Sequence, residues 1–178
     1  MTTNNFSLRG ITPQNDREEN MEEKLGELYN EIANSIISAI PVEWEDIYYL
    51  GEVEKNKKSW SSVFFFKDIN KQQYVKSHDI PQIYGVSESE YRDIMNNINS
   101  ILLRLYDCFI ENSQCVWEQL SLSIKNTGEF NIDYMYDKLK NSKMGQVGRE
   151  VVWAYETFGR IPKEGTYMRK ILEEYLSK

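Results

Sequence analysis

The chain has 178 residues, 40% of them hydrophobic and 13% aromatic, and its formal net charge is −7. This length and apolar content favour one domain with a buried core and argue against a disordered chain. The acidic balance predicts no direct contact with nucleic acid, because binding phosphates requires a basic surface. The sequence holds no apolar run of about 18 residues, and its first twenty residues lack the hydrophobic core of a secretory signal. We therefore expect a cytoplasmic protein without a membrane partner.

Residues 1–20 are polar, show no periodicity and predict a flexible tail ahead of a single domain over residues 21–178. A helix is predicted over residues 21–40, because apolar side chains then recur every three or four positions. They are Met21, Leu25, Leu28, Ile32, Ile36 and Ile40. Pro41 ends this helix, since proline has no backbone N–H to donate.

Two strands are predicted next, in "EWEDIYYLGEV" and "WSSVFFFKD". Apolar side chains occupy both odd and even positions, so both faces of the sheet are apolar. Such a sheet is either covered on both faces, or covered on one face and left with an exposed apolar surface on the other that can bind a partner. The segment "QQYVKS" predicts a short third strand and "DIPQIYGV" predicts a loop.

The second half of the chain predicts one long helix, a hairpin and two further helices. Ser87 and Glu90 have the spacing of a capping box, and an apolar stripe continues to about Asn112. The segments "VWEQLSLSI" and "EFNIDYMYDKL" flank the turn "NTG" and predict an antiparallel pair. The fold class is therefore α+β. We expect an antiparallel sheet of about four or five strands, with an N-terminal helix, a long central helix and two C-terminal helices packed on it.

The segment "GQVGREVVWAYETFGRIP" is expected to serve the fold. Its glycines allow a close turn against the sheet, its last glycine caps a helix, and its proline prevents continuation. Val152 and Tyr155 are predicted to pack inward. Arg149 and Glu156 are predicted to form a buried or half-buried polar contact. With the earlier helix stop, the predicted structural positions are Pro41, Gly145, Gly148, Arg149, Tyr155, Gly159 and Pro162.

The residues needed for common enzyme chemistry are sparse. His78 is the single histidine, and no matched nucleophile accompanies it. The motifs CxxC and HExxH are missing and "GQVGRE" is not a phosphate-binding loop, so neither a metal nor a cofactor is predicted. Asp133 and Asp137 are expected on one strand face about 13 Å apart, too far for two acids acting on one bond in a retaining mechanism. We expect no enzyme; a carboxylate-dependent metal hydrolase is the alternative.

Several segments resemble the YezG-like, or EsaG-like, immunity proteins of Gram-positive bacteria. They are "EEKLGELYNEIANSIISAIPVEWEDIYYLGEV", "VFFF", "DIPQIYGVS" and "GQVGREVVWAYETFGRIP". The resemblance runs from Met21 to the C-terminus, and its first and last segments are the most specific. It implies a small cytoplasmic antitoxin that binds the C-terminal toxic domain, often a nuclease, of a toxin exported by a type VII secretion system. A secretion chaperone or adaptor for the same toxin is a further alternative.

The resemblance suggests a role for the acidic first quarter of the predicted domain. Residues 21–60 contain nine acidic and four basic side chains. A nuclease carries a basic groove, and carboxylates with large aromatics suit a protein that blocks it. The predicted partner-binding residues are Glu43, Trp44, Glu45 and Asp46, followed by Trp117, Asp133 and Asp137. The competing interpretation places Trp44 in the core and the carboxylates on a solvated rim.

Overall fold

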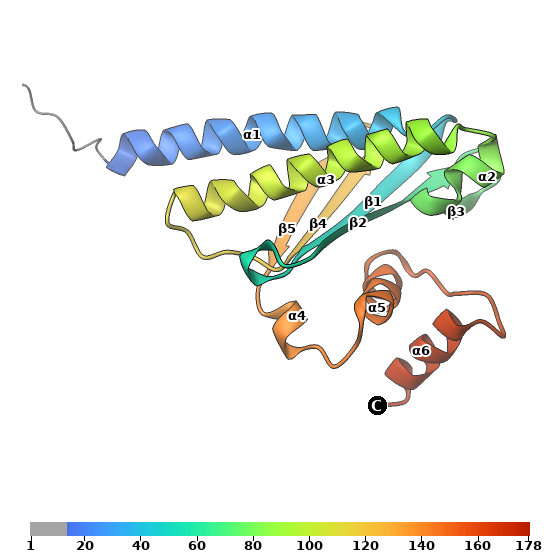
Figure 1. Cartoon of the computed structure of the whole chain (residues 1–178). Coiled ribbons are helices and arrows are strands. Elements are labelled where there is room, and N and C mark those ends of the chain that lie inside the picture. Colours follow the sequence, from blue (N-terminus) through green and yellow to red (C-terminus); the bar gives the residue numbers. More distant parts are fainter. Residues whose placement is uncertain (1–13) are drawn as a thin grey trace, which may run out of the picture.

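In the computed structural model, which describes residues 14–178, five antiparallel strands form the middle layer of the molecule (Figure 1). The spatial order is β3-β2-β1-β4-β5, so β1 lies at the centre. The strands are β1 (Trp44–Val53), β2 (Trp60–Asp68), β3 (Gln73–Lys76), β4 (Gln119–Lys125) and β5 (Phe130–Met135). The α+β class predicted from the sequence is confirmed, with five strands in the sheet.

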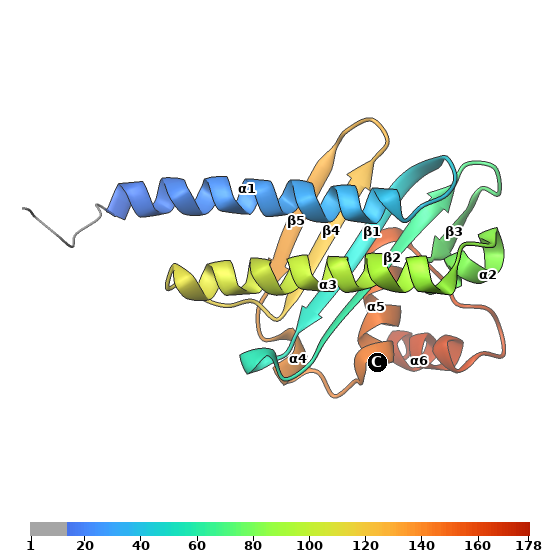
Figure 2. The ribbon, with the colours of Figure 1, turned by 45° about the horizontal axis from the view of Figure 1, so that its top comes forward.

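Two long helices cover the first face of the sheet (Figure 2). They are α1 (Gln14–Ser38) and α3 (Glu88–Glu111), and they pack against each other. The predicted start of α1 at Met21 is wrong by seven residues. Residues 14–20 are polar and carry no apolar stripe, so sequence periodicity gave no sign that the helix begins before Met21. The first thirteen residues of the predicted tail lie outside the described part of the chain.

The main core fills the space between these helices and the sheet. Ile32 and Ile36 of α1 are fully buried against Tyr49 and Phe64 of the sheet. The capping of α3 follows the predicted spacing, since Ser87 Oγ accepts a hydrogen bond from Glu90 N at 3.4 Å. The stripe read from the sequence therefore faces the sheet and accounts for the position of both helices.

The connection from β3 to α3 is helical, where the sequence predicted a loop. A short 3-10 turn (Ser77–Asp79) leads into α2 (Ile80–Tyr84). Pro81 lies in the first turn of α2, where a missing N–H costs nothing, and Gly85 ends the helix with a left-handed φ of 68°. Five residues are too few to display helical periodicity, so only these end signals distinguished the segment.

The second face of the sheet is covered by α5 (Gln146–Phe158), against which α6 (Tyr167–Leu176) packs. A one-turn helix, α4 (Lys138–Asn141), precedes them. A smaller core lies under α5, where Phe65 and Leu50 of the sheet meet Trp153. Both faces of the sheet are therefore covered, which was one of the two arrangements predicted from its apolar faces.

A buried ion pair attaches α5 to the centre of the sheet. Arg149 donates from Nε and Nη2 to the Glu52 carboxylate at 2.9 and 2.8 Å, and Gln119 donates to the same carboxylate at 2.7 Å. The hydrogen bond to Glu52 raises the pKa of Arg149 above its ordinary value. The predicted partner of Arg149, Glu156, is exposed and instead accepts from Tyr175 Oη on α6. The ion pair of Arg149 with Glu52 therefore joins α5 to the sheet.

The inward face of α5 differs from the predicted one. Val151 and Trp153 are buried, whereas Tyr155 is half exposed. Gly148 is buried, and a methyl group there would lie 3.0 Å from Met144 Cβ, so this glycine permits a close approach. Gly159 ends α5 with a φ of 72°, as predicted from its place after the apolar stripe. The two C-terminal helices were correctly predicted, but the rotation of α5 about its axis was not.

None of the helices within residues 14–178 combines the length and the apolar character needed to cross a bilayer.

Replacing Ile36 by alanine tests the main core. Ile36 has no exposed surface, so the change should lower the free energy of unfolding by about 2–5 kcal/mol. The neighbouring half-exposed Ile37 provides the control, and Ile37→Ala should cost less. Urea denaturation measures both values. A loss below about 0.5 kcal/mol for Ile36→Ala would contradict the assignment of this face to the core.

Replacing Arg149 by alanine tests the attachment of α5. The Glu52 side chain is 5% exposed, and the change leaves its charge buried without a cation. We expect a loss of about 3–5 kcal/mol in the free energy of unfolding. Arg169→Ala removes an exposed ion pair with Glu173 and should cost less than about 1 kcal/mol. Equal small losses for the two variants would show that the buried pair does not hold the helix.

Candidate functional site

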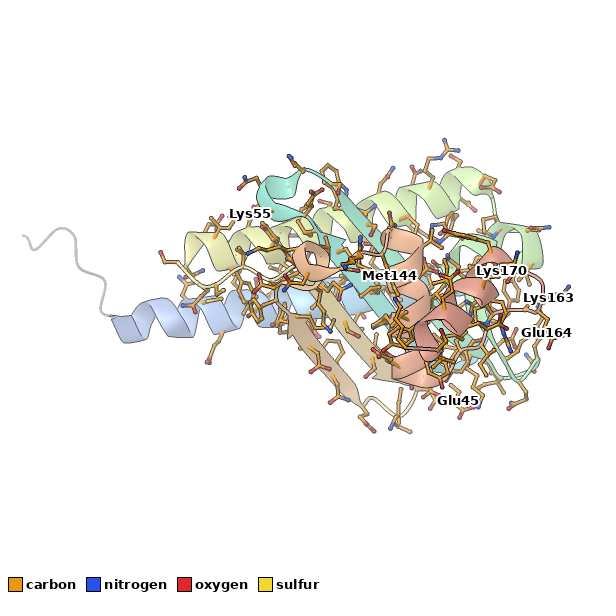
Figure 3. The ribbon with its side chains drawn as sticks, turned by 90° about the horizontal axis from the view of Figure 1, so that it is seen from below. Glu45, Lys55, Met144, Lys163, Glu164 and Lys170 are labelled. Carbon is orange, nitrogen blue, oxygen red and sulfur yellow. The ribbon has the colours of Figure 1, made fainter. Side chains whose placement is uncertain are left out.

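The predicted partner-binding residues other than Trp117 and Asp137 lie on two surfaces. The first, the acidic edge, consists of residues 43–46 at the start of β1. The second, the open face, is the part of the second sheet face on β4 and β5 that α5 and α6 leave uncovered (Figure 3). It carries Ser123, Asn131 and Asp133, whereas Ser121 on the same sheet face lies under α5 and accepts a hydrogen bond from Trp153 Nε1 at 3.0 Å. Asp46 lies on the same sheet face, because alternate strand residues share a face and Asp46 pairs with Lys125 of β4.

The acidic edge is held by backbone hydrogen bonds on both sides. Ile69 N donates to Glu43 O at 3.2 Å, and Asn126 N donates to Glu45 O at 2.9 Å. Asn126 Nδ2 also donates to Trp44 O at 3.2 Å. The ladder between β1 and β2 shifts register between Trp44 and Ile47, which marks a bulge at this point. Fixed backbone on both flanks makes the edge a preorganised surface.

A shallow hollow lies at the acidic edge, where α1 ends. Its volume is about 770 Å³. The residues that line it are Ile40, Pro41, Val42, Glu43, Trp44, Ile69 and Asn126. Trp44 is half buried: it packs against the main core and also lines the hollow. Trp44 therefore contributes both to the core and to the surface of the hollow, which the sequence analysis treated as alternatives. Pro41, which follows the end of α1, also lines the hollow.

The carboxylates of the edge differ in their partners. Glu45 forms an ion pair with Lys67 at 2.8 Å, and this hydrogen bond raises the pKa of Lys67. Asp46 accepts a hydrogen bond from Tyr74 Oη at 3.4 Å, and the pKa of Tyr74 is raised, first by burial and then by the neighbouring Tyr48 and Asp46 charges. Glu43 is exposed and forms no ion pair with any residue in 14–178. Glu43 is thus the most available charge for a partner.

Asp133 and Asp137 do not share a strand face as predicted. Strand β5 ends at Met135, and Asp137 adopts a left-handed φ of 57° ahead of α4. Asp133 is exposed on the open face, opposite Ser121 of β4. The prediction extended the strand because Tyr136 continues its alternation, but this side chain is 45% exposed and lies beyond the last strand pair.

Trp117, one of the predicted partner-binding residues, is buried in the folded protein. Its side chain has no exposed surface and packs edge-on against Tyr106, with ring centroids 5.4 Å apart. Tyr134 lies on its other side at 5.5 Å. The residue belongs to the main core and cannot contact a partner in the folded state.

A groove between the end of β5 and the three C-terminal helices was missed by sequence reasoning. Its volume is about 660 Å³, and Met135, Tyr136, Met144, Trp153 and Tyr175 contribute to its lining. Arg149 and Asp137 also line it. The residues come from β5, α4, α5 and α6, so no single segment shows the pattern. Exposed Tyr136 beside methionines was the available signal, since aromatic and methionine side chains are common at interfaces.

Candidate metal ligands do not cluster in the described part of the chain. Among residues 14–178, no three His, Cys, Asp or Glu side chains gather closely enough to hold a metal ion. His78 lies near Tyr91, and burial lowers its pKa below the usual value, with the positive charge of Lys76 adding to the effect. The geometry instead offers hollows and charged rims of the kind that contact another macromolecule.

Comparison with known proteins identifies the family. The profile of the YezG-like immunity proteins matches residues 25–172. The chain is 35% identical to immunity protein YezG of Bacillus spizizenii over 154 residues, which cover 86% of this chain and 93% of that protein. It is 30% identical to the type VII secretion system protein EsaG of Staphylococcus aureus, covering 88% and 96% of the two chains. Immunity protein YezG of Bacillus subtilis is 30% identical over 78% of this chain and 90% of its own length. This chain therefore belongs to the YezG-like immunity protein family.

Proposed function

We propose that this protein is a cytoplasmic antitoxin that binds the C-terminal toxic domain of a toxin exported by type VII secretion. The toxic domain is a nuclease, and the protein neutralises it stoichiometrically, without catalysis. Family membership supports the immunity role, and the name of the Staphylococcus aureus relative supports the link to type VII secretion. The observation that carries the choice of surface is the preorganised acidic edge beside its hollow.

The acidic edge complements the surface that a nuclease requires. A nuclease binds phosphates through lysine and arginine side chains, so its groove attracts carboxylates. Glu43 is exposed at the rim of the hollow, and Asp46 and Asp133 extend the negative charge along the open face. The half-buried Trp44 supplies an aromatic surface at the centre of this region. Charge then steers the encounter, and the aromatic contact holds the complex.

Co-expression with the toxic domain tests the function. The partner is the C-terminal domain of the toxin encoded beside this chain's gene, produced without its secretion domain. An antitoxin should restore growth and should purify with the toxic domain as a stoichiometric complex. Rescue of export without protection against the isolated toxic domain would identify a secretion chaperone instead. Inactivation of the toxin by substoichiometric amounts of this protein would identify an enzyme.

The double charge reversal Glu43→Lys/Glu45→Lys tests the acidic edge. It should lower the association rate with the toxic domain more than it raises the dissociation rate, because exposed charges act mainly on encounter. The wild-type rate should also fall with salt, since the Debye length shrinks from about 10 Å at 0.1 M to about 3 Å at 1 M. Stopped-flow kinetics at two salt concentrations measures both effects.

The matched control is Glu22→Lys/Glu23→Lys near the other end of α1. It produces the same change in net charge, and both side chains are exposed. The helix from Glu23 to its last residue, Ser38, spans about 22 Å, which exceeds the Debye length of about 10 Å at 0.1 M salt. If the two double variants slow association equally, only net charge matters, and the acidic edge is not the recognition surface.

A further inference from the structure

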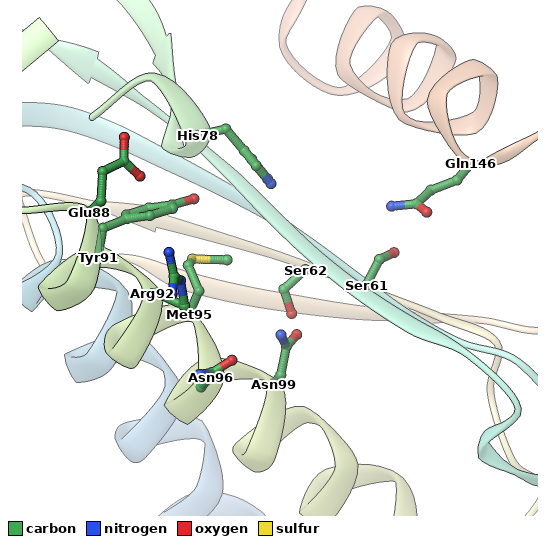
Figure 4. Close-up of a pocket in the computed structure, with 10 residues that line it drawn as sticks. All are labelled: Ser61, Ser62, His78, Glu88, Tyr91, Arg92, Met95, Asn96, Asn99 and Gln146. Atoms are coloured by element: carbon green, nitrogen blue, oxygen red, sulfur yellow. The ribbon is translucent and has the colours of Figure 1, made fainter. Parts of the chain in front are cut away.

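The two borders of the sheet differ in how their backbone is covered. At one border, β3 pairs with residues 65–68 of β2, and the rest of the β2 edge lies at a cavity of about 330 Å³, lined by side chains of α3 and by Gln146 at the start of α5 (Figure 4). At the other border, β4 is the only strand within residues 14–178 that pairs with β5. Strand β5 therefore has an unpaired outer edge along its whole length, to which another strand can add.

One hydrogen bond gives the direction of the β5 backbone groups. Glu118 N donates to Met135 O at 2.9 Å, so the Met135 carbonyl points toward β4. Because strand geometry repeats every two residues, the N–H and C=O groups of Ile132 and Tyr134 point the other way, out of the sheet. These groups are placed to pair with an incoming strand.

The side chains of β5 give its two faces different characters. Phe130, Ile132 and Tyr134 pack against the main core but are only half buried. Asn131 and Asp133, on the open face, are exposed. Side chains of an added strand would lie beside these residues on each face. The edge therefore suits a strand that is apolar on the first face and polar on the other.

Helix α1 covers the first face of the sheet at this edge. A hydrogen bond of 2.7 Å joins the hydroxyls of Tyr29 and Tyr134, and the Tyr29 ring centroid lies 6.2 Å from that of Phe130. These contacts, on either side of Ile132, place α1 across the middle of β5, and the helix continues past the border of the sheet (Figure 2). A strand added to β5 would therefore enter beneath α1.

The same crossing disfavours a second copy of this chain as the added strand. Two copies paired along the whole of β5 about a two-fold axis would place their α1 helices over neighbouring strands, which lie about 5 Å apart. Packed helices lie about 8–10 Å apart, so the two α1 helices would overlap. An extended segment without a covering helix avoids this clash.

Asp133 is the uncompensated charge of β5. It forms no ion pair within residues 14–178, whereas Glu129, in the turn ahead of β5, pairs with Lys125 at 2.8 Å. The backbone groups of Asp133 point toward β4, like those of Met135. An added antiparallel strand would therefore meet Asp133 in a non-hydrogen-bonded pair, in which opposed side chains lie closest. A basic side chain fits the position opposite Asp133.

We propose that an extended segment of the toxin adds to β5 as a sixth strand, antiparallel like every other pair in this sheet. The inference rests on the proposed function and specifies how the toxin binds at the open face. Opposite residues 134 to 130, the segment has the pattern apolar-basic-apolar-polar-apolar, with its base facing Asp133. The backbone pairing supplies affinity, and the alternating side chains supply the selection of sequence.

Amide hydrogen exchange tests the added strand directly. The probe is the purified complex of the full chain with the toxic domain encoded beside its gene. The Ile132 and Tyr134 amides should exchange quickly in the free chain and at least about tenfold more slowly in the complex, because opening of a paired strand is required for exchange. The Asn131 and Asp133 amides point toward β4 and are the internal control, since they should be protected in both samples.

The same experiment identifies other occupants. Protection of Ile132 and Tyr134 that grows with the concentration of the free chain would identify a second copy. Protection in the free chain at every concentration would identify residues 1–13 of the same chain. Either result would overturn the proposal, and so would a protected toxin segment that lacks the alternating pattern with its base.

Replacing Ile132 by proline tests the backbone pairing. Ile132→Pro removes the outward N–H but no hydrogen bond to β4, and an edge strand tolerates proline at such a position. Ile132→Ala is the matched control, because it removes the same side-chain contacts and keeps the N–H. Affinity for the toxic domain, measured by titration calorimetry, should be at least about tenfold lower for the proline variant than for the alanine variant. Equal affinities would overturn the pairing.

Replacing Asp133 by lysine tests the charge and does not depend on how well the proline variant folds. Asp133→Lys should weaken binding about fivefold, because like charges would then face each other across the strand pair. The matched control is Glu164→Lys, which makes the same change in net charge at an exposed position between α5 and α6. Equal losses for the two variants would overturn the assignment of a base opposite Asp133.

The outcomes distinguish this proposal from the function on which it rests. Failure of the toxic domain to bind the chain at all would overturn both. A tight, neutralising complex in which Ile132 and Tyr134 stay unprotected would overturn the added strand alone and leave the proposed function standing.

Discussion

The structure depends on a central sheet that has apolar side chains on both faces. Tyr49 and Phe64 point to one face, and Leu50 and Phe65 to the other, so water must be excluded from both sides. The two long helices α1 and α3 cover the first face. The second face is covered by α5, which the buried pair of Arg149 with Glu52 fixes in place. The three-layer arrangement is a direct consequence of this constraint.

The surfaces available to a partner lie where the helices and the edge strands leave the sheet uncovered. Helices α5 and α6 lie over only part of the second face (Figure 3), and Asn131 and Asp133 of β5 are exposed. The short β3 leaves half of the β2 edge without a neighbour. At the start of β1, a helix end and a bulge meet and form the acidic edge. Each surface is held by packed structure behind it, which suits binding with little reorganisation.

Most elements could be predicted because long amphipathic segments report their environment through periodicity. The stripe from Leu28 to Ile40 and the capping box at Ser87 are local signals, and the structure confirms both helices. The errors fall where local signals are weak or ambiguous. A five-residue helix such as α2 shows no period, and Tyr136 continues an alternation after the strand has ended. The burial of Trp117 could not be read from the sequence, because an aromatic residue suits a core and an interface equally well.

The sequence by itself determined the α+β class, the acidic character of residues 21–60 and the resemblance to immunity proteins. These properties reside in composition and in spacing along the chain. Only the tertiary structure decided that Trp117 is buried, that Arg149 pairs with Glu52 across 97 positions, and that Tyr91 and Asn99 of α3 line one cavity with Ser62 of β2. Which side chains are buried, and which strand edges are paired, depends on segments that are distant in the chain and meet only when the layers pack.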